Sequence, residues 1–131
     1  MPRHARTRPV SAAQVDAYLA KAEEYLAAAA SELEAGRAIA ATSLAIHAAI
    51  NAADVVTGVR MGRRAAGQDH DQVLALLHEA GKDGAEMETD LARLLPLKTK
   101  AEYDPEDIPK AEATRAIERA TRCVVVARRL A

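Results

Sequence analysis

Apolar residues recur every three or four positions over most of the chain, which is the spacing that places them on one face of an α-helix. Gly36, Gly62 and Pro96 interrupt this pattern, and helices commonly end at such residues. Ser11 followed by Gln14 fits a capping box at the start of the first helical segment. The pattern predicts five helices and no strands, over residues 11–33, 37–61, 70–80, 85–95 and 109–129, with one long connection over residues 97–108.

The composition favours the same fold class. Of the 131 residues, 32 are alanine, three are tyrosine and none is phenylalanine or tryptophan, whereas strands are rich in aromatic and β-branched residues. We therefore predict an all-α, up-down bundle of four to five helices, forming one domain over residues 11–131 after a flexible, arginine-rich tail over residues 1–10. No uninterrupted run of about 18 apolar residues exists and the first ten residues do not resemble a signal peptide, so we expect a soluble, cytoplasmic protein without membrane contact.

The segment over residues 37–61 is apolar on nearly every face, yet it carries a polar stripe. At 100° per residue the stripe falls within an arc of about 80°, and a charged carboxylate buried without a partner is costly. We expect Asp54 to accept hydrogen bonds from His47, from a neighbouring arginine or from Tyr103. The stripe is either such a network, within one chain or across a dimer, or the lining of a pocket. Its residues are Ser43, His47, Asn51, Asp54 and Gly58.

Basic residues gather in two places although the net charge is only -1. Arg60, Arg63 and Arg64 lie close together, and a row of arginines lies on one side of the last helix. Either group could contact phosphates, or the row could form ion pairs with acidic residues of the other helices. Val125 and Val126 lie on or beside the row, which predicts a partner surface there and a homodimer. The row is Arg115, Arg119, Arg122 and Arg129.

Three short blocks, in this order, resemble HEPN domains (higher eukaryotes and prokaryotes nucleotide-binding). Asn51-Ala-Ala-Asp54 resembles the Gln-Ala-Ala-Glu block of the family's second helix. The segment over residues 69–77 resembles its Thr-His-x-Leu-x-x-Leu segment, and residues 101–113 resemble its Arg-x-Tyr-Asp turn and last helix. The resemblance implies an up-down helical bundle, usually a homodimer. Family members act as metal-independent ribonucleases, as toxins paired with a nucleotidyltransferase-like antitoxin, or as non-catalytic binding modules for RNA or nucleotides.

The family's ribonucleases use an Arg-x(4–6)-His motif, and Arg64 and His70 satisfy that spacing with five residues between them. By the resemblance, His70 would act as the base and Arg64 would stabilise the charge on phosphate. Arg60 and Arg63 would attract the RNA strand by their positive charge. The segment between the two contains Gly67, and a loop rarely holds catalytic groups accurately. We therefore expect a dimeric binding module, with a ribonuclease or a purely structural dimer as alternatives, and neither a metal site nor a cofactor.

Overall fold

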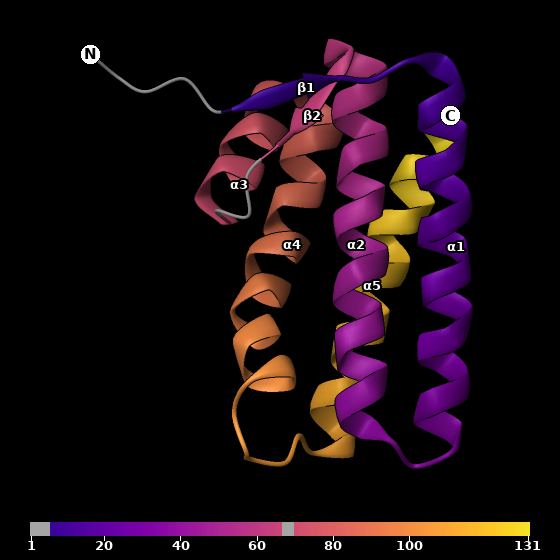
Figure 1. Ribbon diagram of the computed structural model, residues 1–131, viewed down its shortest axis with the longest axis vertical. Coiled ribbons are helices and arrows are strands. Elements are labelled where there is room, and N and C mark those ends of the chain that lie inside the picture. Colours follow the sequence, from indigo (N-terminus) through magenta and orange to yellow (C-terminus); the bar gives the residue numbers. More distant parts are fainter. Residues whose placement is uncertain (1–5, 67–69) are drawn as a thin grey trace.

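The computed structural model describes residues 6–66 and 70–131. Within these residues five helices form one bundle, with a two-stranded ribbon across one end (Figure 1). The prediction of an all-α bundle is confirmed. The elements in chain order are β1 (Thr7–Pro9), α1 (Ala12–Glu34), α2 (Ala38–Met61), β2 (Arg63–Ala65), α3 (His70–Glu79), α4 (Gly81–Glu102) and α5 (Lys110–Leu130).

The helix α2 is the central element of the bundle. It packs against α1, α4 and α5, and α5 lies behind it in the view of Figure 1. Alanine side chains are small enough to bring helix backbones close together, and larger aliphatic side chains fill the space between the layers. Fully buried examples are Ala45, Ile46, Ala49, Ala52, Val55, Val56, Leu91, Leu94, Ala120 and Val124.

Helix α2 is also long and apolar enough to cross a membrane by length and composition alone. In the folded chain, however, 61% of its most apolar window is buried inside the bundle. A core helix of a soluble protein has these properties, because it is surrounded by other helices rather than by lipid.

The ends of the first two helices follow the local sequence signals. The Ser11 hydroxyl accepts a hydrogen bond from the backbone N–H of Gln14 at 3.2 Å, and the Gln14 side chain accepts one from the Ser11 N–H at 2.9 Å. This is the predicted capping box. Gly62 ends α2 in the left-handed conformation, with φ of 66°, which glycine adopts without steric cost.

The prediction that a helix ends at Pro96 is wrong, because α4 continues through it to Glu102. A proline inside a helix removes one hydrogen bond and crowds the preceding turn, at a cost of about 3 kcal/mol. Leu94 and Leu95 before the proline are buried, and Leu97 after it packs against the core. Burial of these side chains on both sides offsets the local cost, so the predicted long connection is reduced to residues 103–109.

The two short strands were not predicted from the sequence, and residues 7–10 do not belong to a flexible tail. Strand β1 pairs antiparallel with β2, and Arg8 stands opposite Arg64 in the ladder. Next to the ribbon, Val10 is buried and its N–H donates to the Gly62 carbonyl at 2.9 Å. A Cβ atom on Gly58 would lie 3.0 Å from Val10 Cγ1, so the missing side chain at Gly58 makes room for this segment.

Candidate functional site

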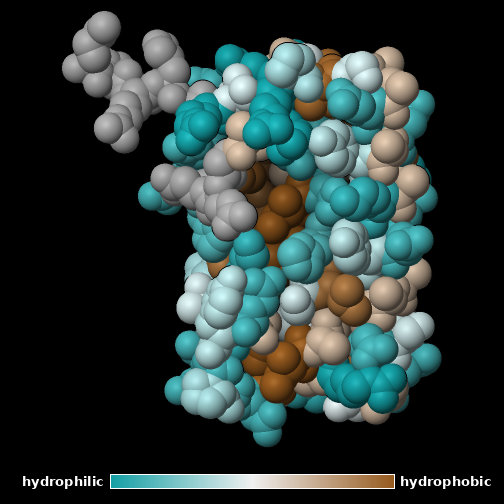
Figure 2. Space-filling view, in the orientation of Figure 1, coloured by the Kyte–Doolittle hydropathy of each residue, from teal (hydrophilic) through white to brown (hydrophobic). Residues whose placement is uncertain are grey.

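The polar stripe of α2 lies between α1 and α4. The His47 Nε2 atom is 3.3 Å from Glu102 Oε1 of α4, and the His47 ring is 5.5 Å from the ring of Tyr25 in α1. Ser43, His47 and Asp54 are half-buried, whereas Asn51 and Gly58 are buried. In the orientation of Figure 2, apolar surface appears in patches along the course of α2, separated by hydrophilic side chains. The stripe therefore lines a mixed polar and apolar surface.

Within the described residues of one chain, the predicted hydrogen-bond network around Asp54 is not formed. The Asn51 amide donates to the backbone carbonyl of His47 at 2.8 Å, and the His47 ring faces Glu102 instead. Tyr103 is 77% exposed in the connection after α4. Among the described residues, no donor lies within hydrogen-bond distance of the Asp54 carboxyl group. His47 faces Glu102 and Tyr103 points into solvent, so of the expected partners only an arginine, Arg64, acts on Asp54, and it does so through its charge.

Burial dominates the chemistry of Asp54. It raises the pKa of this carboxyl group from 3.8 to about 7, although the positive charges of Arg64 and Lys21 act in the opposite direction. A charged carboxylate loses its hydration in such a position, and the neutral acid loses much less. Asp54 is therefore a carboxyl group that exchanges its proton near neutral pH.

Arg64 is held at the ribbon end of the stripe. Its guanidinium carbon lies 5.7 Å from the centre of the Tyr18 ring, a cation–π distance. Its Nη1 atom donates to the Ala65 carbonyl at 3.1 Å. Cross-strand register places Arg8 directly opposite it. Tyr18 and Arg8 were missed in the sequence analysis, because a pairing between residues so far apart in the chain leaves no periodic signal.

The candidate catalytic residues Arg64 and His70 lie on either side of residues 67–69, which are outside the described ranges. No hydrogen bond or ion pair joins their side chains in the two described ranges, and Gly67 lies outside them. Arg64 belongs to β2 and His70 begins α3, so two different elements carry them.

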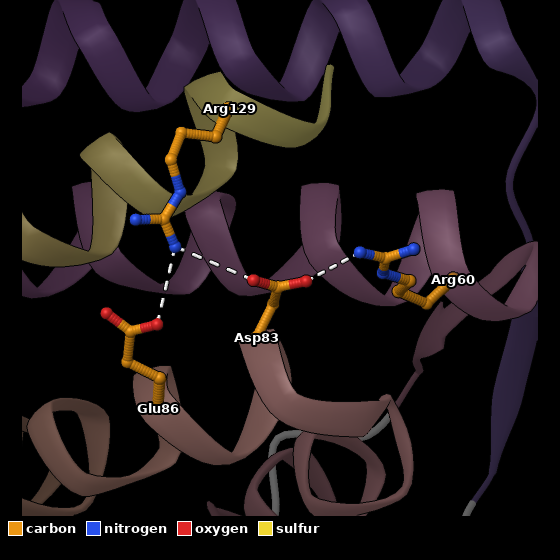
Figure 3. Close-up of polar contacts among 4 residues, drawn as sticks. All are labelled: Arg60, Asp83, Glu86 and Arg129. Atoms are coloured by element: carbon orange, nitrogen blue, oxygen red, sulfur yellow. Dashed lines mark hydrogen bonds and ion pairs between the residues drawn. The ribbon is translucent and has the colours of Figure 1, made fainter.

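The other two arginines of the predicted basic cluster form ion pairs with acidic side chains. Arg60 Nη2 lies 2.6 Å from Asp83 Oδ2, and Arg63 Nη2 lies 3.9 Å from Glu79 Oε2. Figure 3 shows that Asp83 also faces Arg129 of α5, at 3.5 Å. The hydrogen bond from Arg60 is the main reason why the pKa of Asp83 lies below its usual value. Arg60 and Arg129 therefore tie α2 and α5 to α4, whereas Arg63 links β2 to α3.

In the arginine row of α5, some members form ion pairs with acidic residues of α4 and others form none within the described residues. Arg122 donates three hydrogen bonds to Asp90 of α4, and Arg129 contacts Asp83 and Glu86 of α4. The interpretation of the row as ion pairs is confirmed for these two arginines. Arg115 is exposed and has no ion pair within the described part of the chain. Arg119 is half-buried, and its Nε atom is buried without a hydrogen-bond partner.

A large cavity adjoins the other end of the stripe. It has a volume of about 890 Å³ and lies among the first turn of α2, the end of α4 and the first turn of α5. Ser43 and Glu102 line it, and so does Ile39, an isoleucine that is 39% exposed. Glu102 was not predicted as a site residue, because the helix was expected to end before it.

Neither cysteine nor metal chemistry is indicated. Cys123 is buried, and burial raises the pKa of its thiol to about 12, so the reactive thiolate does not form at neutral pH. Among residues 6–66 and 70–131, no group of three histidine, cysteine or acidic side chains is placed to hold a metal ion.

No protein-family model matches the sequence, and a search of curated proteins finds no match either.

Proposed function

We propose that the chain is a HEPN-like helical binding module that works as a dimer in the cytoplasm and binds RNA or nucleotides without cleaving them. Three sequence blocks resemble the family, and the all-α bundle is compatible with it. In this proposal the physiological partner is a nucleotidyltransferase-like protein, and the pair acts in a toxin–antitoxin or defence system.

One observation carries the binding site. Arg64 is held over the Tyr18 ring, and its charge acts on the half-buried Asp54 carboxyl group, which titrates near neutral pH. Arg8 faces Arg64 across the ribbon, and like charges in that position repel each other. A phosphate group between the two guanidinium groups would remove this repulsion and accept charge-assisted hydrogen bonds from both. When protonated, Asp54 can also donate a hydrogen bond to a carbonyl or ring nitrogen of a nucleobase.

The same geometry argues against the ribonuclease alternative. Metal-free cleavage needs a base and a cation held accurately at one phosphate, whereas Arg64 and His70 belong to two different elements, β2 and α3. The nuclease interpretation assigns Arg60 and Arg63 to binding of the RNA strand, but they face Asp83 and Glu79 instead.

The first experiment measures binding of a labelled single-stranded RNA by fluorescence anisotropy in EDTA. We expect Arg64→Ala to weaken binding at least about 10-fold, the size of one lost charge-assisted contact. Arg115→Ala is the matched control, since Arg115 is exposed and unpaired in the described structure but lies on α5. Equal effects of the two substitutions, or no binding by the wild type, would contradict the proposal.

A second assay separates binding from cleavage. Wild type and His70→Ala are incubated with the same RNA without metal, and the products are separated on a denaturing gel. We expect intact RNA with both proteins. Robust cleavage by the wild type that is lost in His70→Ala would instead establish the ribonuclease alternative.

A further inference from the structure

A small hollow with an apolar floor lies between α4 and α5. Its volume is about 230 Å³, and its walls include Met87 and Val126, both buried. Val125 stands at its edge and is 42% exposed. The sequence analysis placed Val125 and Val126 together on an exposed surface, and this is wrong for Val126, which is 3% exposed. The same patch thus offers a projecting apolar side chain and a cavity beside it.

Two ion pairs border this hollow. Arg122 lies 2.8 Å from Asp90, and Arg129 lies 3.3 Å from Glu86, with one partner of each pair on α5 and the other on α4. All four side chains line the hollow. The patch therefore has an apolar centre, a charged border and no excess of either sign.

From this arrangement we infer that the α4–α5 face binds a second copy of the chain around a two-fold axis, with Val125 of each copy entering the hollow of the other. The inference rests on the dimer in the proposed function and names its surface. A two-fold interface requires a patch that is complementary to itself. The patch meets that requirement because the projecting Val125 lies beside the hollow, and because its border carries two positive and two negative side chains.

The balanced charge of the α4–α5 patch also favours a second copy of the chain as its partner. An RNA or an acidic protein segment would favour a patch with excess positive charge, whereas this border is balanced. A second copy can place its Arg122 and Arg129 near the acids of the first copy, and the reverse. The ligand site proposed above uses α1, α2 and the ribbon, so a dimer built on α4 and α5 leaves those elements to the ligand.

Sedimentation velocity at micromolar concentration tests the inference. We expect the wild type to sediment as a dimer and Val125→Glu to raise the Kd of the dimer at least about 100-fold, because it replaces the apolar side chain that enters the partner's hollow by a charged one. Val59→Glu is the matched control, since Val59 is 38% exposed on α2, and it should remain a dimer. Val125→Ala, which removes the projecting side chain without adding charge, should raise the Kd about 10-fold.

The possible outcomes separate the two proposals. A dimer that persists in Val125→Glu overturns the inferred surface and leaves the proposed dimer intact. A wild type that sediments as a 14.0 kDa monomer overturns both the dimer and its surface. Circular dichroism melting confirms that each variant is folded, and if Val125→Glu unfolds, Val125→Ala decides the question. The anisotropy titration reports RNA binding separately, whichever oligomer is found.

Discussion

Arg8 and Arg64 stand directly opposite each other in a ribbon of only three residues per strand. Neither guanidinium forms an ion pair within the part of the chain that the structure describes. Cross-strand neighbours lie about 5 Å apart at Cβ, and like charges in that position lower the stability of the ribbon. Folding alone would favour another residue at one of the two positions, whereas an anion bound between them would favour arginine at both.

The first prediction follows from this pair. Arg8→Glu would convert the cross-strand repulsion into an attraction and raise the free energy of unfolding by about 0.2–1 kcal/mol. The same substitution should lower the affinity for RNA. Urea denaturation and anisotropy measure the two effects, with Arg115→Glu on α5 as the control. Lower stability together with unchanged affinity would show that the pair has no role in anion binding.

The second prediction concerns Asp54, whose pKa is about 7 in the folded chain against 3.8 as its ordinary value. A carboxyl group with a raised folded-state pKa stabilises the fold below its unfolded pKa, and this contribution is lost as pH rises from about 4 through 7. The difference in unfolding free energy between wild type and Asp54→Asn should therefore fall over that range by up to about 4 kcal/mol, at 1.36 kcal/mol per pKa unit.

Urea denaturation of both proteins at pH 4, 5, 6, 7 and 8 provides the measurement, and subtracting the variant removes the titration of the other acids. No donor among the described residues depends on the Asp54 charge, so Asp54→Asn should be at least as stable as wild type at pH 8. A large loss of stability in Asp54→Asn at pH 8 would show that the carboxylate has a donor after all.

The third prediction concerns Asp83, which faces Arg60 of α2 and Arg129 of α5 (Figure 3). Its pKa is lowered, chiefly by the hydrogen bond from Arg60. A depressed pKa contributes stability above the unfolded-state value of about 3.9, and that contribution disappears as pH falls through the folded pKa. Asp83→Asn should lower the melting temperature at pH 7, and the difference from wild type should shrink as the pH falls below about 3.9. Glu118→Gln, an exposed acid on α5, is the control.

The fourth prediction concerns the close approach of α3 and α4. A Cβ atom on Gly84 would lie 2.0 Å from the Leu77 carbonyl oxygen, a backbone atom that cannot move aside alone. Gly84→Ala should therefore destabilise the protein by about 1–3 kcal/mol or more, in spite of the gain of about 1 kcal/mol in helix propensity. The reverse change at the exposed neighbour, Ala85→Gly, should cost only that propensity term of about 1 kcal/mol. Equal melting temperatures would contradict the packing of these two helices.

Local signals determined most of the helices. The Ser11 capping box and the left-handed Gly62 appear where the sequence predicts them, because both act within a few residues. Pro96 and the ribbon were not predicted, because each depends on residues that are distant in the sequence. Leu95 and Leu97 are anchored in the core around the proline, and Val10 reaches a space that Gly58 leaves open.

The candidate site was predicted only in part, for the same reason. Periodicity correctly grouped Ser43, His47, Asn51 and Asp54 on one side of α2, because spacing along one helix fixes that grouping. It could not identify their partners. Glu102 and Tyr25 beside His47, and Tyr18 beneath Arg64, come from other elements. The positive charges of Arg60, Arg63 and Arg122 could be read from the sequence, but their ion pairs with acidic residues of other elements depend on tertiary structure.

The salt dependence of RNA binding tests the central claim most directly. Each phosphate contact adds about 0.7 to the negative slope of log K against log salt for a single strand. Because Arg8 and Arg64 share one phosphate in this account, the double variant Arg8→Ala/Arg64→Ala should bind more weakly and should have a slope smaller by about 0.7. The same affinity and the same slope in wild type and double variant would contradict a binding site at the ribbon.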